Sequence, residues 1–388
     1  MKKFGLMMYV CRHKMKTFLR IPLIIVLTWN FTLVAQLDNS SFFREGASAI
    51  KVKPAKTLGY NVEVFNFVRN NEYFGTLDPG HTFFGYQFLP SIVWMPSKGN
   101  NLSFRGGLFL LKNFGESGLK SSRITFTMEY KFKHTRFLFG TIEGALSHKL
   151  IEPLYRFERA LEDRIEDGFQ LKHSSKKLWA DAWVDWRATT ELGSNRQEEI
   201  RAGLSSEYFL LGENQSLKDS IEHNNSLKAI TQATILHRGG SFVPQPIVSR
   251  SNFAMGLDYS YFIRKNFSFF AQPFFLYSID HSIQIKQPFK DGWAYYLNLG
   301  IRKSRFTGML SYWNATEYSS NLGMPLMQSF TFNDFYATKR ERQLIFVRLL
   351  YTQKLAPGFN VDLRLEPVYD LKSNDLQYSF GLYFNYKL

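Results

Sequence analysis

The chain has 388 residues, a formal net charge of +15 and a mean hydropathy of −0.23. Phe and Tyr are frequent, with 38 and 20 copies, but the hydropathy excludes a protein built mainly of membrane-spanning helices. The single cysteine, Cys11, lies in the N-terminal segment, which excludes disulfide frameworks and cysteine nucleophiles from the remainder. High aromatic content with middling hydropathy is typical of strands that are apolar on alternate residues only.

Residues 1–35 have the features of a secretory signal peptide. The first 20 residues contain six basic residues and no acid, and an apolar stretch runs from Ile21 to Ala35. This stretch is shorter than the ~20 apolar residues that a spanning helix needs. Without this segment, 42 basic and 33 acidic residues remain, a net charge of +9. No basic helix or recognised motif accompanies that charge, so we expect no nucleic-acid partner.

Residues 36–59 lack regular alternation and are expected to form a lead-in that either hangs in the periplasm or plugs a lumen. From residue 60 onward, apolar and polar side chains alternate in segments of about ten residues. A period of two defines a strand and not a helix. The predicted strands cover residues 60–68, 82–95, 102–111, 123–132, 136–144, 167–174, 178–187, 198–210, 226–237, 252–263, 267–278, 291–302, 306–315, 342–354, 359–369 and 375–388.

Long and short links alternate between these strands, as in outer-membrane barrels, where short periplasmic turns alternate with longer outer loops. Residues 60–388 are therefore predicted to form an all-β, transmembrane, up-and-down antiparallel β-barrel of about 16 strands. The link 211–225 is long where a short turn is expected, which leaves 14 strands as the alternative. The short links are 133–135, 175–177, 264–266, 303–305 and 355–358, and the long ones include 69–81, 112–122, 145–166, 238–251, 279–290 and 316–341.

The chain resembles the porin-like outer-membrane barrels of Gram-negative bacteria, and Bacteroidota-type barrels in particular. The resemblance rests on the Ala35-Gln36 ending of the signal peptide, the aromatic-rich strands and a closing strand that ends with Tyr383 to Leu388. It implies a place in the bacterial outer membrane, contact with membrane lipid and lipopolysaccharide, and folding by the barrel assembly machinery. A homo-oligomer is compatible with the sequence.

Charged residues of both signs fall on the polar faces of the predicted strands. Mixed charges line the water-filled path of a porin, and side chains alone fill a wide barrel with difficulty. The alternative is a closed interior in which the charges pair with one another. The lumen candidates are Glu129, Lys131, Asp181, Asp185, Arg187, Arg201, Glu207, Asp258, Arg302, Arg348, Asp362, Arg364 and Glu366.

The link 145–166 has apolar residues at helical spacing, and Pro153 suits a first helical turn. Its position after the fifth strand resembles that of the porin loop that folds inward, which implies a constriction. The alternative is an external helix packed on neighbouring loops. The apolar stripe is Leu150, Leu154, Phe157, Leu161 and Ile165, and the constriction candidates are Glu152, Arg156, Glu158, Arg159, Glu162, Asp163 and Arg164.

No motif establishes a catalytic or metal site. His148 and Glu152 are four residues apart, a spacing used by metal ligands, but Pro153 biases Glu152 away from helical geometry. Serine and histidine lie close in sequence at several places, but no Gly-x-Ser-x-Gly elbow occurs. We therefore expect no enzyme, no metal and no other cofactor. The candidate Ser and His pairs are Ser147-His148, His281-Ser282 and His237 with Ser241.

Five tryptophans either stack on sugars or form aromatic girdles at the two membrane interfaces, and the girdle is favoured. The expected function is passage of small hydrophilic solutes by diffusion, narrowed by the 145–166 link. The alternative is a non-conducting surface barrel for glycan anchoring or a secretion assembly, and a lipid-modifying barrel enzyme ranks third. The tryptophans are Trp179, Trp183, Trp186, Trp293 and Trp313.

Overall fold

The computed structural model describes residues 57–388 except for several short segments in the links. The predicted signal peptide and nearly all of the predicted lead-in lie outside the described residues. No helix in the described part of the chain is long and apolar enough to cross a membrane. The described ranges are 57–74, 78, 80–96, 101–191, 193, 195–214, 225–240, 245–264, 266–285, 287–330 and 338–388.

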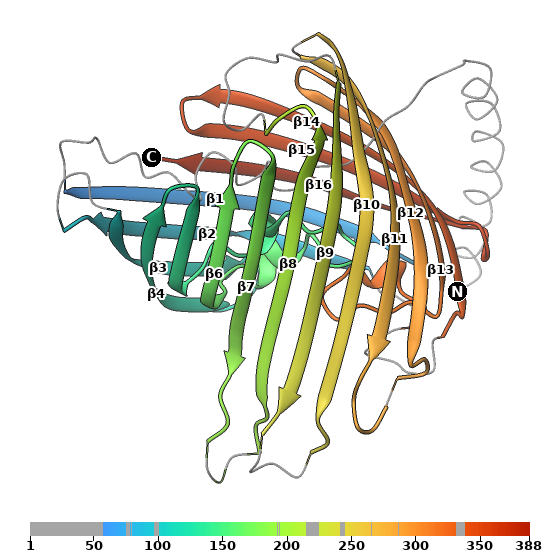
Figure 1. The fold of residues 1–388 in the computed structure, drawn as a ribbon, viewed down its shortest axis with the longest axis horizontal. Coiled ribbons are helices and arrows are strands. Elements are labelled where there is room, and N and C mark those ends of the chain that lie inside the picture. Colours follow the sequence, from blue (N-terminus) through green and yellow to red (C-terminus); the bar gives the residue numbers. More distant parts are fainter. Residues whose placement is uncertain are drawn as a thin grey trace, which may run out of the picture. The chain divides into compact units, whose positions relative to one another are not determined.

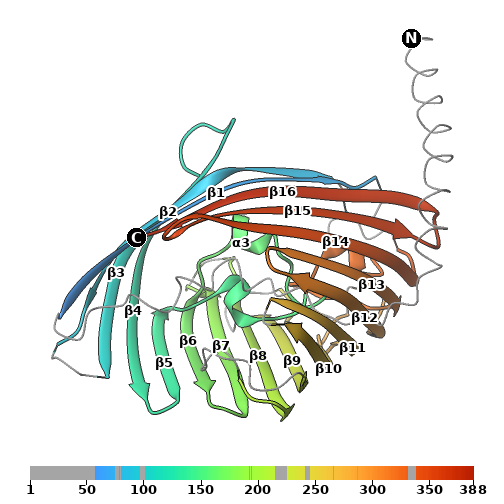
Figure 2. The same cartoon turned by 90° about the horizontal axis from the view of Figure 1, so that it is seen from above.

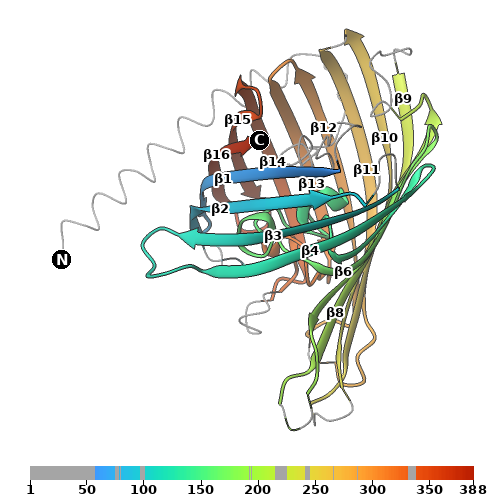
Figure 3. The same cartoon turned by 90° about the vertical axis from the view of Figure 1, so that its left-hand side faces the viewer.

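Sixteen antiparallel strands form one closed barrel (Figure 1). Each strand pairs with its sequence neighbours, and the last strand closes the ring against the first, beside which it lies in Figure 3. The predicted up-and-down barrel is confirmed with 16 strands and not 14. The strands are β1 (Leu58–Glu72), β2 (His81–Trp94), β3 (Leu102–Asn113), β4 (Ser121–Phe132), β5 (Thr135–Thr141), β6 (Asp167–Ser174), β7 (Leu178–Ala188), β8 (Glu198–Leu211), β9 (Asn225–Gly239), β10 (Val248–Arg264), β11 (Phe267–Asp280), β12 (Asp291–Lys303), β13 (Phe306–Thr316), β14 (Glu341–Ala356), β15 (Phe359–Asp370) and β16 (Asp375–Lys387).

The wall of the barrel follows the period-two pattern of the sequence. In β4, Ile124 and Phe126 are exposed, whereas Thr127 and Glu129 are buried on the lumen side. A slip of one residue in register would turn every apolar side chain inward, so burial of one face specifies the register. Exposed aromatic and aliphatic side chains recur around the outside of the barrel, which is the surface that a membrane barrel presents to lipid.

Two kinds of link define two ends of the barrel. The links that follow even-numbered strands include the short turns 133–134, 175–177, 304–305 and 357–358, and we call this end the turn rim. The links that follow odd-numbered strands include the two longest, 142–166 and 317–340, and we call that end the loop rim. The link 212–224 is long although it lies at the turn rim, as the sequence indicated.

β5 ends at Thr141, three residues before its predicted end, because the chain leaves the wall there. Gly140 has a φ of 95°, and a Cβ at this position would lie 2.2 Å from the backbone oxygen of Phe126. Only glycine therefore fits where β5 passes so close to β4. The following residues enter the lumen and do not continue as an outer loop.

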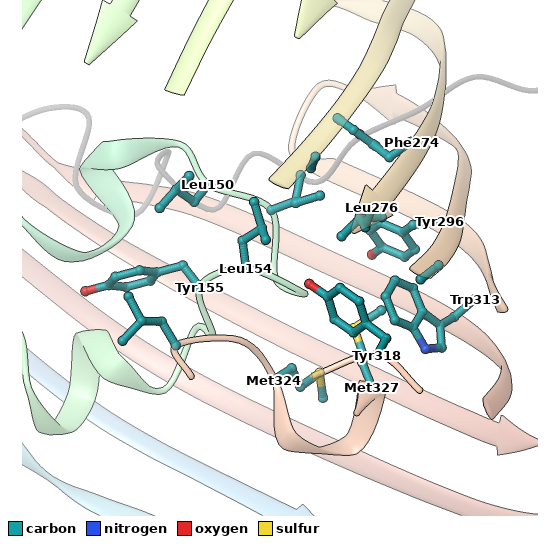
Figure 4. Close-up of a cluster of buried hydrophobic side chains, with 14 of the residues drawn as sticks. Leu150, Leu154, Tyr155, Phe274, Leu276, Tyr296, Trp313, Tyr318, Met324 and Met327 are labelled. Carbon is teal, nitrogen blue, oxygen red and sulfur yellow. The ribbon is translucent and has the colours of Figure 1, made fainter. Parts of the chain in front are cut away.

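Two loop segments, residues 142–166 and 317–330, occupy the lumen, and we call them the plug. Figure 2 shows α3 (Arg159–Glu162), part of the first segment, inside the ring of strands. Figure 4 shows Tyr318 of the second segment beside Trp313, an inward residue of β13, and Leu154 of the first segment belongs to the same buried cluster. A second apolar cluster joins Phe157 of the plug to Phe65 of β1. The barrel interior is therefore packed with apolar side chains over these segments.

The plug is not the amphipathic helix that the spacing of its apolar residues suggests. All five stripe residues are buried, but the first segment contains only the 3₁₀ turn η2 (Ala145–His148) and the single turn α3. A helix this short is marginal by itself, and Pro153 disfavours helical geometry at the residue before it. Contacts with the barrel wall, and not helix formation, therefore decide how this segment folds.

The prediction that the five tryptophans form aromatic girdles is wrong for three of them. Trp179, Trp183 and Trp313 are buried inside the barrel, whereas Trp186 and Trp293 face outward. Positions of the same parity along a strand share one face, so 179 and 183 in β7 point inward while 186 points outward. The inward tryptophans pack against the plug and the lumen polar groups.

Candidate functional site

Three arginines and two glutamates form a buried ion network between the plug and the wall. Arg348 of β14 and Arg364 of β15 both bind Glu152 of the plug, the latter with Nη2 3.1 Å from Oε1. Glu366 accepts from Arg348 at 3.1 Å, from Arg364 at 2.6 Å and from Arg69 of β1 at 2.8 Å. All five side chains are at most a tenth exposed, so their charges interact in a low-dielectric interior.

Other lumen and constriction candidates of the sequence also pair. Asp163 of the plug binds Arg159 at 2.8 Å, and binds Arg187 of β7 at 2.5 Å and Arg201 of β8 at 3.1 Å. These contacts hold the end of the first plug segment against the wall. Further pairs are Glu158 with Arg69, Arg164 with Glu63, Arg156 with Glu162, and Glu129 with Arg136 and, more weakly, with Lys131.

Glu207 and Asp258 both bind Lys228 of β9, and the guanidinium of Arg302 lies over the ring of Phe270. Hydrogen bonds hold three further candidates, and one more candidate is exposed. Asp181 is fully buried beside His148, Asp185 accepts the backbone N–H of Asp167, and Asp362 accepts the hydroxyl of Thr352. Lys131 lies near the turn rim with its side chain 54% exposed. The inward placement of the predicted charges is thus largely observed, and the charges pair with one another. A role for them in solute selectivity stays a prediction.

A buried histidine links the plug to the wall. His148 Nε2 lies 2.8 Å from Glu166 Oε2 and its Nδ1 lies 3.0 Å from Asp181 Oδ2. The hydroxyl of Tyr155 donates to Glu166, and the ring of Trp183 stacks on the imidazole with centroids 4.4 Å apart. Burial alone would lower the pKa of His148, but the two carboxylates raise it to about 9. Both ring nitrogens therefore donate, and His148 is an imidazolium at neutral pH.

This protonation state predicts that stability falls in mild alkali. The pKa of His148 is raised from 6.5 to about 9. Its contribution to the free energy of unfolding is therefore complete below pH 6.5 and is lost as the pH rises through 9. The contribution is on the order of 3 kcal/mol. The denaturant midpoint of the barrel in lipid, measured at intervals from pH 6 to pH 10, tests this. In a His148→Gln variant, the denaturant midpoint is expected to stop falling with pH over this range. An unchanged fall of the midpoint with pH would contradict a protonated His148.

The serine beside His148 is not positioned as its nucleophile. The Oγ of Ser147 donates to the backbone oxygens of Glu143 and Gly144, the latter at 2.8 Å. The spacing of His148 and Glu152 does not create a metal site either, because Glu152 binds the arginines of the wall. In the part of the chain that the structure describes, no group of three or more His, Cys, Asp or Glu is arranged to hold a metal ion.

A second polar cluster lies where the link between β1 and β2 meets both plug segments. Glu158 accepts from Arg69 Nε at 2.9 Å and from Asn71 Nδ2 at 3.2 Å. Asp78, in the link itself, accepts the backbone N–H of Leu326 in the second plug segment. We call these residues, with Tyr73 and Arg156, the mouth cluster. Unlike the histidine network, this cluster reaches solvent, because the side chain of Arg156 is 33% exposed.

The mouth cluster holds a carboxyl group whose ionisation is poised near neutral pH. Burial and the charge of Glu158 raise the pKa of Asp78 to about 7, and Arg156 and Arg69 only partly oppose them. Two further groups lack a hydrogen-bond partner among the described residues, the Oδ1 of Asn71 and the hydroxyl of Tyr73, both of which are buried. Perturbed carboxyl groups next to unpaired polar atoms are typical of functional sites.

No sequence motif marks Asp78, Asn71 or Tyr73, because these residues fall in or beside a link. Their one sequence signal is that this link is long for a barrel hairpin. Arg156 and Glu158 are constriction candidates of the sequence, and the structure brings them to the same cluster. Their proximity depends on the plug entering the lumen, which the alternation of residues does not indicate.

The family model of the lipid A 3'-O-deacylase-type proteins matches residues 50–388. The chain belongs to this family. Because it is an enzyme family, the expectation that the chain has no enzymatic activity is wrong. The absence of known catalytic motifs in the sequence was the basis of that expectation, and the family match overturns it.

This deacylase-type barrel is also similar in fold to solved outer-membrane proteins. OprD of Pseudomonas aeruginosa is 12% identical, with a TM-score of 0.48 over 86% of this chain and 94% of its own. A loop-deletion mutant of OmpT of Vibrio cholerae is 11% identical, with a TM-score of 0.49 over 86% and 99%. OccAB3 of Acinetobacter baumannii is 11% identical, with a TM-score of 0.49 over 85% and 99%. No curated protein sequence matches the chain.

The deacylase-type barrel is a protein of the bacterial outer membrane. A closed ring of strands with an apolar exterior leaves no unpaired sheet edge in lipid, which is the condition for spanning a membrane with strands. The predicted fold, family resemblance and location are therefore confirmed, while the predicted lack of enzymatic activity is corrected.

Proposed function

We propose that this protein hydrolyses an ester-linked acyl chain of lipid A at the outer membrane. The observation that carries the proposal is membership of the lipid A 3'-O-deacylase-type family over residues 50–388. The lipid-facing barrel supports it, because the wall gives the protein direct access to a lipid substrate. The mouth cluster supports it further, because it combines a carboxyl group of raised pKa with a cation.

The chemistry required is the addition of water to an ester carbonyl. In this scheme the carboxylate of Asp78 accepts a proton from water as the water oxygen attacks the carbonyl carbon. The guanidinium of Arg156 stabilises the negative charge that develops on the carbonyl oxygen. The bond between that carbon and the ester oxygen then breaks, and the leaving oxygen takes up the proton. The products are a fatty acid and an alcohol on the glycolipid, so atoms and charge balance.

The location of the mouth cluster favours it over the histidine network as the reactive site. Asp78 and Arg156 lie at the loop rim, the end of the barrel that faces the outer leaflet in outer-membrane proteins. His148 is fully buried and holds its proton near neutral pH, so it is a poor base. Asp78 at a pKa of about 7 is matched to base catalysis at neutral pH.

The test is mass spectrometry of lipid A after incubation with the purified, refolded barrel in detergent. We expect a product lighter by one acyl group together with the free fatty acid. Lipid A incubated with heat-unfolded protein is the control. An unchanged lipid A over a range of divalent-ion concentrations and detergents would contradict the proposed activity.

The same assay measures how the rate of acyl release depends on pH. Since the pKa of Asp78 is raised to about 7, the carboxyl group is protonated and inactive below that pH and ionised above it. The initial rate is therefore expected to rise about tenfold for each pH unit below 7 and to level off above it. A rate that is flat between pH 5 and pH 7 would exclude Asp78 as the base without excluding the activity.

Passage of small solutes through the lumen is the second candidate function. The inward charges predicted from the sequence support it, whereas the ion-paired and apolar packing of the plug opposes it. Conductance steps of the purified protein in a planar bilayer would favour passage. A silent bilayer, with acyl release in the first assay, would favour the deacylase alone.

A further inference from the structure

The turn rim carries a set of exposed cations. Within the described residues of the links at this rim there is one acidic residue, Glu213, and it is half-buried. Among the described residues of these turns and of the adjoining strand ends, the exposed positive charges are therefore not balanced by exposed acids. We call them the basic collar, which consists of Lys133, Lys176, Lys177, Arg264, Lys303, Arg305 and Lys354.

The loop rim differs in its charge pattern. Exposed acids and bases alternate there, and some of them pair, as do Lys372 and Glu341 at 2.7 Å. The basic collar is thus a property of one end of the barrel and not of the whole surface. The exposed charges of the loop rim include Glu116, Lys120, Glu191, Arg196, Lys290, Asp291, Glu341 and Lys372.

Four members of the collar are direct neighbours of an exposed apolar side chain. Phe132 precedes Lys133, Ile263 precedes Arg264, Phe306 follows Arg305 and Leu355 follows Lys354, and each of these apolar side chains is about half exposed or more. The Nζ of Lys133 lies 5.4 Å from the ring centroid of Phe132. The same arrangement therefore occurs at four separate turns around the ring.

An exposed apolar side chain beside an exposed cation suits the boundary between acyl chains and headgroups. The apolar group enters the hydrocarbon layer, and the cation extends to the level of the lipid phosphates. Clusters of Lys and Arg at this level attract anionic lipids. Because the turn rim lies on the periplasmic side in outer-membrane barrels, these phosphates belong to the phospholipids of the inner leaflet.

We infer that the basic collar is a binding surface for the phosphate headgroups of anionic phospholipids, such as phosphatidylglycerol. The collar lies at the opposite end of the barrel from the mouth cluster, and this inference does not depend on the proposed hydrolase activity. The collar would fix the height and tilt of the barrel in the membrane. That position decides the depth at which the loop rim meets the outer leaflet.

Native mass spectrometry of the barrel, released from nanodiscs of phosphatidylglycerol and phosphatidylethanolamine in equal amounts, tests the inference. The wild-type protein is expected to retain phosphatidylglycerol in excess. A collar variant with Lys133→Gln, Arg264→Gln, Arg305→Gln and Lys354→Gln is expected to reduce that excess about tenfold. A matched loop-rim variant with Lys120→Gln, Arg196→Gln, Lys290→Gln and Lys372→Gln is expected to retain it.

Two further measurements keep the test decisive. Raising the salt from about 0.05 M to about 0.5 M is expected to weaken the excess in the wild-type protein, which requires no variant to fold. Replacing phosphatidylglycerol with lipid A is expected to make the collar variant and the wild type equivalent. No excess of the anionic phospholipid, an equal loss in the loop-rim variant, or a collar effect on lipid A alone would each overturn the inference.

Discussion

Replacement of Asp78 by asparagine is expected to lower the rate of acyl-ester hydrolysis about 10²- to 10⁴-fold, the usual contribution of a general base. Asparagine has nearly the same shape and still accepts a hydrogen bond from the backbone N–H of Leu326, but it cannot accept a proton from water. The measurement is the initial rate of fatty-acid release from lipid A at pH 8, where the wild-type carboxyl group is ionised.

The matched control for this variant is Asp291→Asn. Asp291 is also an acid at the loop rim, but it lies at the start of β12 and outside the mouth cluster. We expect its rate to equal that of the wild-type protein. A further variant, Asp78→Glu, keeps a carboxyl group and is expected to recover part of the activity with the same rise in rate with pH. Equal rates for Asp78→Asn and the wild type would show that Asp78 is not the base, while the activity itself would stand.

The Glu366→Ala variant is expected to lower the free energy of unfolding by about 3–5 kcal/mol. Glu366 accepts from Arg69, Arg348 and Arg364, all of which are buried, and alanine would leave these cations with fewer carboxylates. The cost arises from burying positive charge without enough compensation, and not from the loss of one attractive contact. Urea unfolding in lipid vesicles, followed by tryptophan fluorescence, measures this loss of stability.

An exposed ion pair provides the control for Glu366. Glu341 binds Lys372 at 2.7 Å, but solvent screens both charges, so Glu341→Ala is expected to leave the unfolding midpoint unchanged. Glu366→Gln keeps an acceptor and removes the charge, and its midpoint is expected to lie between those of Glu366→Ala and the wild type. If Glu366→Ala were no less stable than Glu341→Ala, the network would not hold the barrel and plug together.

The local sequence is sufficient to predict the strands that form the wall of the barrel. Each strand carries its own period-two pattern, and the pattern of β4 or β16 determines which side chains face lipid without reference to any other element. The side chains of lumen parity include Asp181, Arg348 and Glu366, and all three are buried in the structure. Short turns such as Lys133-His134 also follow from local chemistry, so strand number and topology could be predicted.

Only the tertiary structure decided what fills the interior of the barrel. The spacing of Leu150, Leu154 and Phe157 shows that this segment buries one side, but not what covers it, because an external loop would carry the same pattern. In the closed barrel, the wall covers the apolar side of this segment. The same packing brings Glu158 of the plug beside Asn71 of β1, which is 87 residues away in sequence. The raised pKa of Asp78 arises from the same folding, since neither its burial nor the nearby charge of Glu158 exists in the unfolded chain. A strand pattern depends on consecutive residues and can therefore be recognised in the sequence. The mouth cluster depends on contacts between distant residues, which form only after the plug enters the lumen.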